Sequence, residues 1–404
     1  MKELRDILNK FTEHSSVKNS FYVFYPGRVY HQTRLWNKYL PFITPHYAIK
    51  SNPESLLIKT LHPQGVLFDC ASKQEIELVK NSVSITTSLG NHIVYANPCK
   101  SVEDLVYAKN NGSPITVVDS HEEIDKLVSV GYSGGAYIRI TVDDSSSKMP
   151  FSGKFGLHPT LVQELGSYAK KCNIEVHGIS FHVGSACSDG KSYYKAIRVA
   201  QELNSILKQQ GHPSNTIDIG GGFLSDSTDF KNKAQYITKA YDPQYKYIAE
   251  PGRFFSHRSQ DFFVKVIGKK PWSSGWRYTI DDSIYGQFSC IPFDHVVPTW
   301  SRVISGNDTV RSRTAGVLFG RTCDSVDVIA KSSSMEELEI NDWLWFPHMG
   351  SYTNATANEF NGFPKPPVLS YCETTPEEYQ LNLIDHLPDN VETIKPLSSA
   401  ELLR

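Results

Sequence analysis

A lysine that ends an apolar run is the residue around which the chemistry of this sequence can be organised. Residues 45–50 read PHYAIK, a β-prone stretch that Asn52-Pro53 then interrupts. A lysine at the C-terminal end of a parallel strand can lie in a partly dry pocket, where the pKa of its amine falls. The free amine can then attack a carbonyl and form a Schiff base. A single lysine is more often simply solvated, so the interpretation of Lys50 depends on the residues that accompany it.

A run of three glycines supplies a second group with recognisable chemistry. Gly220, Gly221 and Gly222 follow the strand-like stretch 215–219. Without side chains, their backbone N–H groups can approach an anion closely, as a phosphate-binding loop requires. A tight turn is an equally good explanation of the glycines taken alone. In barrel folds, however, the loops after the last strands commonly bind phosphate.

A carboxylate and an imidazole complete the set. Glu250 ends the run 246–250, and its carboxylate can pair with a protonated ring nitrogen, while Arg253 can face a phosphate. A structural Glu–Arg ion pair is the simpler alternative. His182 can stack on a flat ring, although a lone histidine of this kind is more often a satisfied core residue. Together with Lys50 and the glycines, these residues describe a site for pyridoxal phosphate.

Eight apolar, strand-like runs alternate with helical segments and must position these groups. This alternation predicts a parallel sheet with right-handed crossovers. Eight strands fit a (β/α)8 barrel, and a doubly wound open sheet is the alternative. Ser72 and Ser101 are candidate caps of helices 73–80 and 102–110, and residues 121–130, 158–173 and 192–209 also have helical spacing. The eight runs are residues 45–50, 66–70, 92–96, 115–119, 136–142, 177–183, 215–219 and 246–250.

The polar residues of interest share one position relative to the predicted strands. Each lies at or just past a C-terminal strand end, and in a barrel these ends converge on one face, where active sites are built. Six chemically useful residues on one rim are a stronger signal than any of them singly. They are Lys50, Asp69, Arg139, His182, Gly220 and Glu250.

After about residue 258 the pattern changes to short strands. Runs at 261–267, 276–280 and 316–319 are separated by Gly, Ser, Asn and Pro rather than by long helices, which predicts a β-rich second domain. The stretch 21–24 also reads as a strand and can join that domain.

The predicted domains follow from this change. A PLP-binding barrel takes residues 25–258, and a β-rich domain takes 1–24 with 259–404. A helix carrying Leu4, Leu8 and Phe11 precedes strand 21–24. The last ~25 residues are polar, and we expect them to be loosely held.

Composition excludes several classes of function. The 404 residues carry a net charge of -2, which gives no electrostatic argument for nucleic-acid or membrane binding. Seven cysteines without a C-x-x-C pair indicate free thiols in a reducing compartment and no zinc-finger site. The start MKELRDILNK lacks the apolar run of a signal peptide, and no run approaches the length of a membrane span. We therefore expect a cytoplasmic protein without a metal site.

The motifs, in their order, resemble those of the fold-type III pyridoxal-phosphate decarboxylases, specifically the eukaryotic-type ornithine decarboxylases. The resemblance covers nearly the whole chain. It implies an alanine-racemase-like (β/α)8 TIM barrel followed by a β-rich, sandwich- or barrel-like domain, and a head-to-tail homodimer with shared active sites. The matching stretches are YAIKSN (47–52), FDCAS (68–72), KFG (154–156), SFHVGS (180–185), DIGGGF (218–223), AEPGRF (249–254), YGQFSCIPFDH (285–295), GRTCDSVD (320–327), DWLWFPHMGSYT (342–353) and FNGF (360–363).

The resemblance also implies a role for each matching barrel residue. Lys50 would hold pyridoxal phosphate as a Schiff base, Glu250 would pair with its ring nitrogen, and His182 would stack on the ring. Asp69 and Arg139 would lie close to the Schiff base. The residues implied around the phosphate are Ser185, Gly220, Gly221, Gly222, Gly252, Arg253 and Tyr352.

Residues of the second domain would complete the site of the other subunit. The resemblance implies that Cys323 and Asp324 of the partner subunit enter the site, and that Asp294 acts with Asp324 on the distal amine of the substrate. A cysteine beside a carbanion can donate a proton, and two carboxylates suit a terminal ammonium group. The remaining implied residues are Phe293 and Phe360 in the substrate pocket and Lys154 at the interface.

The predicted reaction is the decarboxylation of L-ornithine to putrescine and CO2, a step of polyamine biosynthesis. Decarboxylation of arginine or lysine stays open, because it needs only a different pocket depth around residues 291–296 and Asp324. The diaminopimelate branch typically carries Cys-Glu where this chain has Cys323-Asp324, so it ranks lower.

Two further classes of function would explain only part of the pattern. A catalytically inactive, antizyme-inhibitor-like binding protein would have lost cofactor residues that are intact here. A barrel isomerase that binds a sugar phosphate would explain the glycines but not Glu250 and Cys323 together. The resemblance allows an antizyme-type regulator as a partner without indicating one.

Two departures from the usual motifs lie near the predicted chemistry. Ala186 stands where FHVGSG has its last glycine, and Arg321 replaces the proline of GPTCD. Neither removes a candidate catalytic residue, and both bear on turnover rate and fine specificity.

Overall fold

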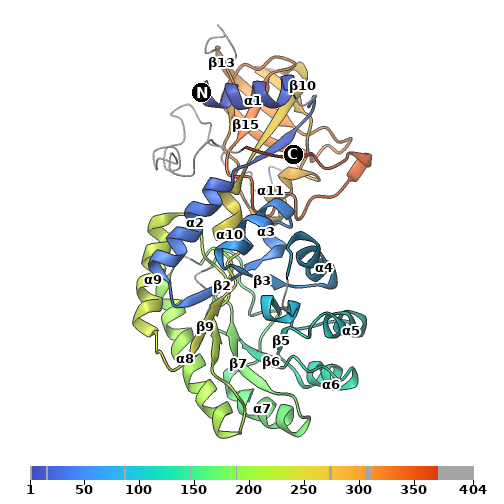
Figure 1. Ribbon diagram of the computed structural model, residues 1–404. Coiled ribbons are helices and arrows are strands. Elements are labelled where there is room, and N and C mark those ends of the chain that lie inside the picture. Colours follow the sequence, from blue (N-terminus) through green and yellow to red (C-terminus); the bar gives the residue numbers. More distant parts are fainter. Residues whose placement is uncertain are drawn as a thin grey trace. The chain divides into compact units, whose positions relative to one another are not determined.

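The computed structural model describes residues 2–371, except 15–16, 86–87, 146, 188, 273–274 and 305–310. The chain divides into two compact units. Val29–Phe255 form one unit, and the segments before and after it form the other. Figure 1 traces the chain through both units.

A closed barrel of eight parallel strands forms the first unit. Strand β9 pairs with β2, at Ile43 opposite Tyr247, and this pairing closes the barrel. All eight strands predicted from the sequence are present, so the (β/α)8 barrel is confirmed and the open sheet is excluded. The strands are β2 Ile43–Ala48, β3 Leu67–Cys70, β4 Ile93–Tyr95, β5 Ile115–Val118, β6 Ala136–Ile140, β7 Val176–Phe181, β8 Thr216–Asp218 and β9 Lys246–Ala249.

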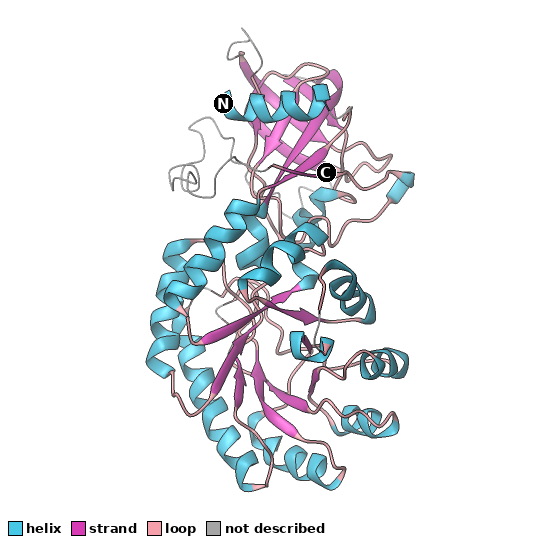
Figure 2. Cartoon of the chain, in the orientation of Figure 1, coloured by secondary structure: helices cyan, strands magenta, loops and turns pink. Residues whose placement is uncertain are grey.

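Helices cover the outside of these strands, as Figure 2 shows. The predicted caps are confirmed, because the hydroxyl groups of Ser72 and Ser101 accept hydrogen bonds from the backbone N–H groups of Glu75 and Asp104. Each such cap stabilises its helix by about 0.5–2 kcal/mol. The helices of this part of the chain are α2 Pro26–Tyr39, α3 Ser55–Leu61, α4 Lys73–Ser82, α5 Val102–Asn110, α6 His121–Ser129, α7 Val162–Lys171, α8 Gly190–Gln209, α9 Ser227–Ala240 and α10 Arg253–Ser256.

One predicted helix begins later than expected. The spacing predicts a helix over 158–173, but the α-helix starts at Val162. Residues Pro159–Leu161 form a 3-10 turn that the side chain of His158 caps. Proline suits the first turn of a helix, where its missing N–H is not needed, so Pro159 marks the entry into this segment.

The second unit is built on an eight-stranded sheet. Strand β1 pairs antiparallel with β10 and parallel with β16, which confirms that stretch 21–24 joins the β-rich part of the chain. The strands are β1 Phe21–Phe24, β10 Gln260–Trp272, β11 Gly275–Ile280, β12 Ser301–Arg302, β13 Arg313–Phe319, β14 Val328–Glu336, β15 Trp343–Phe346 and β16 Val368–Ser370.

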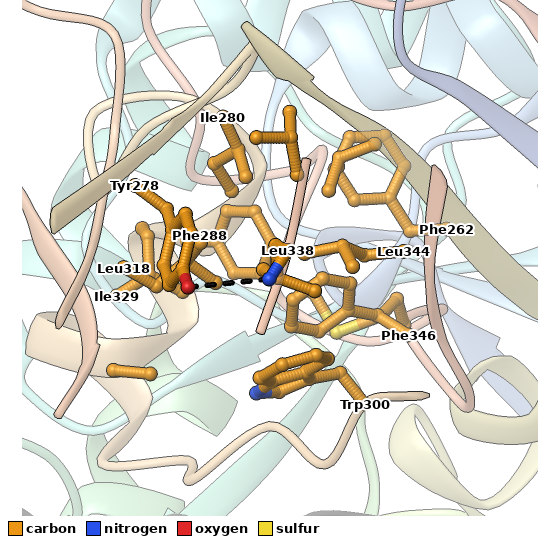
Figure 3. Packing of buried hydrophobic residues seen from close by; sticks show 14 of the residues in the cluster. Phe262, Tyr278, Ile280, Phe288, Trp300, Leu318, Ile329, Leu338, Leu344 and Phe346 are labelled. Carbon is orange, nitrogen blue, oxygen red and sulfur yellow. Dashed lines mark hydrogen bonds between the residues drawn. The ribbon is translucent and has the colours of Figure 1, made fainter. Parts of the chain in front are cut away.

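Two apolar clusters hold this sheet. Figure 3 shows the larger cluster, in which Phe262, Phe288 and Phe346 pack together and the hydroxyl of Tyr278 accepts a hydrogen bond from the Leu338 N–H at 3.2 Å. Helix α1 (Lys2–His14) contributes to a second cluster, with Leu4, Ile7, Leu8 and Phe11 buried alongside Phe21 and Phe263. The predicted apolar face of this helix is therefore used for packing.

Within the described part of the chain, no helix has the length and apolar character needed to cross a membrane. The six cysteines found there are free thiols. The polar C-terminal stretch that we expected to be loosely held lies outside the described residues.

Candidate active site

Lys50 and Asp69 form an ion pair on the barrel. Lys50 lies in the 3-10 turn η1 (Ile49–Ser51) directly after β2, and Asp69 lies on the neighbouring strand β3. The Lys50 Nζ atom is 3.3 Å from Asp69 Oδ2. The side chain of Asp69 is 1% exposed, whereas that of Lys50 is 45% exposed. A buried anion thus orients an amine that a carbonyl compound can still reach.

A second carboxyl group, Glu75, lies beside this pair and was not singled out as a site residue from the sequence. Its Oε2 atom accepts a hydrogen bond from the Ala71 N–H at 2.6 Å. Burial raises the pKa of Glu75 to about 7, and the nearby charge of Asp69 also raises it. The signal for this residue was the cap motif, because Glu75 stands three positions after Ser72 and reaches back over the first turn of α4.

Glu250 lies directly after β9, and its carboxyl group is buried. No residue in the described part of the chain donates a hydrogen bond to its Oε1 atom. The carboxyl group of Glu250 is hydrogen-bonded to that of Asp218, at the end of β8. Burial raises the pKa of Glu250 well above its usual value, and the charges of Asp218 and Asp69 raise it further. A buried oxygen without a donor is available to a ligand.

Asp218 is the second site residue that sequence reasoning missed. Its Oδ2 atom accepts a hydrogen bond from Ser180 Oγ at 3.0 Å, and its Oδ1 atom accepts one from the Gly220 N–H at 2.9 Å. Burial raises the pKa of Asp218 to about 6. The available signal was the aspartate that precedes the three glycines, two residues before Gly220.

His182 follows β7 and presents a neutral ring. Its Nδ1 atom accepts a hydrogen bond from the Gly184 N–H at 2.9 Å. Its ring packs edge-to-face against that of Phe151, with the ring centroids 4.8 Å apart. Burial holds the pKa of His182 well below its usual value, and the positive charges of Arg139 and Lys50 lower it further. The imidazole is therefore uncharged at neutral pH and can offer a flat face to a ring.

The three glycines pass close to His182 and Glu250. A Cβ atom on Gly221 would lie 2.8 Å from the Glu250 carbonyl oxygen and 2.9 Å from His182 Nε2. Gly220 and Gly222 have φ angles of +63° and +100°, which favour glycine. Within the described residues, the N–H groups of Gly221 and Gly222 donate to no acceptor. This loop has the backbone donors that an anionic group needs.

The other predicted residues of the barrel unit lie on strand β6, which carries Arg139, and on loops, which carry Lys154, Ser185 and Gly252. The Arg139 guanidinium lies 5.1 Å from the Phe155 ring centroid, and the Lys154 ammonium lies 4.9 Å from the same ring. The Ser185 N–H donates to the Met149 carbonyl at 3.0 Å. A Cβ atom on Gly252 would lie 2.9 Å from the Ser51 Cβ, so the segment before α10, which begins at Arg253, passes tightly over η1.

Three predicted residues of the sheet unit, Cys323, Asp324 and Phe360, form a cluster of their own with Tyr285 and Asn361. The Cys323 N–H donates to Asn361 Oδ1 at 3.0 Å, and the Tyr285 hydroxyl donates to Asp324 Oδ2 at 2.5 Å. The ring of Phe360 lies 4.5 Å from that of Tyr285. The hydrogen bond from Tyr285 lowers the pKa of Asp324 below its usual value, so this carboxylate is ionised at neutral pH.

Three predicted residues of the sheet unit lie on other segments. Helix α11 (Cys290–Asp294) ends at Asp294 and carries Phe293, which is 61% exposed. Tyr352 follows β15 and has a φ angle of +53°.

The residues of the barrel unit fit pyridoxal phosphate. Lys50 supplies an accessible amine, and the N–H groups of Gly221 and Gly222 can bind a phosphate. The unsatisfied Oε1 atom of Glu250 can accept a hydrogen bond from a protonated ring nitrogen. The neutral ring of His182 can stack on the cofactor without adding charge.

Comparisons with known proteins agree with this fit. Residues 26–257 match the family described as pyridoxal-dependent decarboxylase, pyridoxal binding domain. The chain belongs to the pyridoxal-dependent decarboxylase family. Residues 258–350 match the C-terminal sheet domain of these decarboxylases. The predicted fold, cofactor and enzyme class are thereby confirmed, whereas the roles of individual residues stay predictions.

Several decarboxylases are similar over most of their length. A probable ornithine decarboxylase of Dictyostelium discoideum is 35% identical over 91% of this chain and 82% of its own length. Ornithine decarboxylase of Mus musculus is also 35% identical, over 90% of this chain and 84% of its own length.

Two solved structures are similar in fold. The arginine decarboxylase of Paramecium bursaria Chlorella virus has a TM-score of 0.85 at 35% identity, over 92% of this chain and 100% of its own. A lysine/ornithine decarboxylase of Vibrio vulnificus complexed with cadaverine has a TM-score of 0.82 at 29% identity, over 92% of this chain and 99% of its own.

The two departures from the decarboxylase motifs have structural counterparts. Ala186 adopts a φ angle of +50°, the left-handed conformation that a glycine would adopt without strain. Arg321 donates from Nη1 to the Asp281 carbonyl at 2.8 Å, and its guanidinium lies 3.8 Å from the Phe363 ring centroid. In this decarboxylase the arginine therefore links the Cys323 loop to two neighbouring segments.

Proposed function

We propose that the chain is an ornithine decarboxylase, which removes CO2 from L-ornithine and leaves putrescine. One observation carries the proposal: a lysine amine paired with a buried aspartate and a buried glutamate oxygen without a donor occur together in a barrel of the pyridoxal-dependent decarboxylase family. The substrate is supported by the curated relatives named ornithine decarboxylase, at 34–35% identity.

Lys50 anchors the cofactor through its amine, and Asp69 orients that amine. Bound pyridoxal phosphate supplies an electron sink for the electron pair that the departing carboxylate leaves behind. Glu250 accepts a hydrogen bond from the ring nitrogen and thereby favours its protonated form. The depressed pKa of His182 keeps its ring neutral, so it supports the cofactor without competing for the proton at the ring nitrogen.

We further propose that two copies form a homodimer with shared sites in the cytoplasm. Cys323 of the partner subunit donates a proton to Cα after CO2 has left, and Asp324 of the partner subunit binds the distal ammonium group of ornithine together with Asp294. The exposure of Phe293 (61%) and Phe360 (41%) supports an interface, because large apolar side chains are costly to leave in water.

The proposed domain roles follow from the same dimer. Residues 25–258 bind the cofactor, and residues 1–24 with 259–404 complete the site of the partner.

Arginine decarboxylation is the second candidate. It is favoured by the similarity to the Chlorella virus arginine decarboxylase, whose identity of 35% equals that of the ornithine decarboxylases. The two substrates differ in length and in the group at the distal end, so the choice depends on the pocket near α11 and Asp324.

Release of CO2 by the purified protein with pyridoxal phosphate tests the proposal. We expect L-ornithine to be preferred over L-lysine and L-arginine. Lys50→Ala should abolish release, whereas Lys59→Ala, on the exposed side of α3, should not change it. Preference for L-arginine would replace the proposed substrate. A colourless protein that releases no CO2 from any substrate would point to a binding protein instead.

A further inference from the structure

Two buried carboxyl groups are in contact at the proposed cofactor site. The side chain of Asp218 is completely buried, and Glu250 is 7% exposed. Their carboxyl groups share a hydrogen bond, although each comes from a different strand end. Two carboxylates in contact in a dry environment cannot both be ionised, because their repulsion is poorly screened. The pair therefore holds one proton.

The hydrogen bonds around the pair identify the group that is ionised. Asp218 accepts hydrogen bonds from Ser180 Oγ and from the Gly220 N–H, and both favour a carboxylate. Glu250 receives no such bond on Oε1 from the described residues. Asp218 is therefore the carboxylate, and Glu250 is the acid that donates its proton to Asp218.

Other charged or titratable groups face the pair from three elements. Asp69 comes from β3, Lys50 from η1, and Tyr137 from β6. The negative charge of Asp69 disfavours ionisation of both carboxyl groups, and the positive charge of Lys50 favours ionisation of Glu250. Burial raises the pKa of Tyr137 above its usual value, so its hydroxyl stays protonated.

We propose that Asp218 is a positioning residue for the cofactor. By accepting the proton of Glu250 on one side of that carboxyl group, it leaves Oε1 as the acceptor for the ring nitrogen. Asp218 also supplies the negative charge that balances the protonated ring. This inference rests on the proposed function of Glu250. It assigns to Asp218 an effect on the cofactor that is exerted through Glu250.

The proposal makes cofactor affinity depend on the charge of the pair. At low pH the pair takes up a second proton, its negative charge is lost, and affinity for a protonated ring falls. The hydroxyl of Ser180 favours the ionised form of Asp218. Ser180→Ala should therefore move the acid limb of cofactor affinity upward by about one pH unit, since one hydrogen bond to a charged group is removed.

The test is a titration of the cofactor-free protein with pyridoxal phosphate between pH 5 and 8.5, followed by the absorbance of the bound cofactor. We expect Ser180→Ala to bind as the parent protein does at pH 8.5 and roughly tenfold more weakly on the acid limb. Protonation of the free cofactor is the same in both titrations and does not affect the difference. Ser214→Ala is the matched control, because Ser214 is also buried in the barrel unit but donates to Asn204.

A double variant tests whether Ser180 affects cofactor affinity through Asp218. In an Asp218→Asn background, Ser180→Ala should no longer shift the pH profile. Superimposable profiles of the parent and Ser180→Ala would overturn the proposal, as would equal weakening at every pH or a shift that persists beside Asp218→Asn. If the proposed function fails, the protein will bind pyridoxal phosphate normally yet release no CO2 from ornithine, which leaves these titrations interpretable.

Discussion

Replacing Gly221 by alanine tests how tightly the residues around the proposed cofactor site are packed. Gly221 has no positive φ angle, so alanine imposes no backbone strain and adds only one methyl group. That methyl group would lie 2.8 Å from the Glu250 carbonyl oxygen and 2.9 Å from His182 Nε2. Both distances are shorter than a van der Waals contact, so both contacts have to be relieved by movement.

The free-energy cost of the substitution depends on how these close contacts are relieved. The backbone at Glu250 is held by the hydrogen bond from its N–H to the Gly220 carbonyl at 2.8 Å, so residue 221 has to shift away from it and the His182 ring has to move as well. Its movement strains the hydrogen bond from the Gly184 N–H. Overpacking of this kind costs about 1–3 kcal/mol. When the whole cost falls on cofactor binding, it corresponds to roughly 5- to 150-fold weaker binding of pyridoxal phosphate.

The assay is the dissociation constant of pyridoxal phosphate for the cofactor-free protein, with urea unfolding measured in parallel. Gly153→Ala is the control, because a Cβ atom there would meet no atom within 4 Å. We expect Gly153→Ala to leave both quantities unchanged. Unaltered cofactor affinity in Gly221→Ala would refute the reasoning, because the loop would then have room that the structure does not give it.

Three further changes have expected outcomes. Ala186→Gly removes the backbone strain of an alanine in the left-handed conformation. It should keep the free energy of unfolding unchanged or raise it by up to about 1 kcal/mol in urea titrations. A clear loss of stability would show that Ala186 is not strained. Arg321→Ala removes the link between the Cys323 loop, the Asp281 carbonyl and the Phe363 ring, and should raise KM for ornithine several-fold while cofactor affinity stays unchanged. An unchanged KM would show that the loop holds its position without the arginine. Burial lowers the pKa of His46 to about 4, below its value in the unfolded chain, so its contribution to stability is complete above about pH 6.5 and is lost as the pH falls toward 4. The loss is about 1.4 kcal/mol per pH unit, and His46→Gln should flatten the pH dependence of urea unfolding between pH 7 and 5; an equally steep dependence would exclude His46 as its source.

Elements whose signals are local were predictable from the sequence. Each barrel strand is a short apolar run, and Ser72 and Ser101 cap their helices where the pattern predicted. Lys50 and Asp69 were recognisable because both follow the same rule, a polar residue at a C-terminal strand end. The ion pair between them follows from the parallel pairing of β2 with β3, which sets Ala48 opposite Asp69.

The relation between Asp218 and Glu250 could not be predicted in the same way. Each residue belongs to a different motif, and their contact depends on the register of β8 against β9, which sets Asp218 opposite Ile248. A single sequence does not encode that register in a local pattern. Glu75 was missed for a related reason. Its place in the helix cap accounts for a glutamate at this position, and only the folded barrel places it beside Asp69.

The position of strand β1 has a consequence for how the chain is made. Tyr22 pairs with Phe262 and with Val368, so a strand that precedes the barrel is completed only by segments that follow it. The barrel between them is one uninterrupted stretch, and domains fold as units while the ribosome is still working. We therefore expect the barrel to form first on the nascent chain, while β1 remains unpaired until β10 and then β16 have left the exit tunnel. During that interval the apolar strand Phe21–Phe24 is exposed, and it is the segment that a chaperone would be expected to protect.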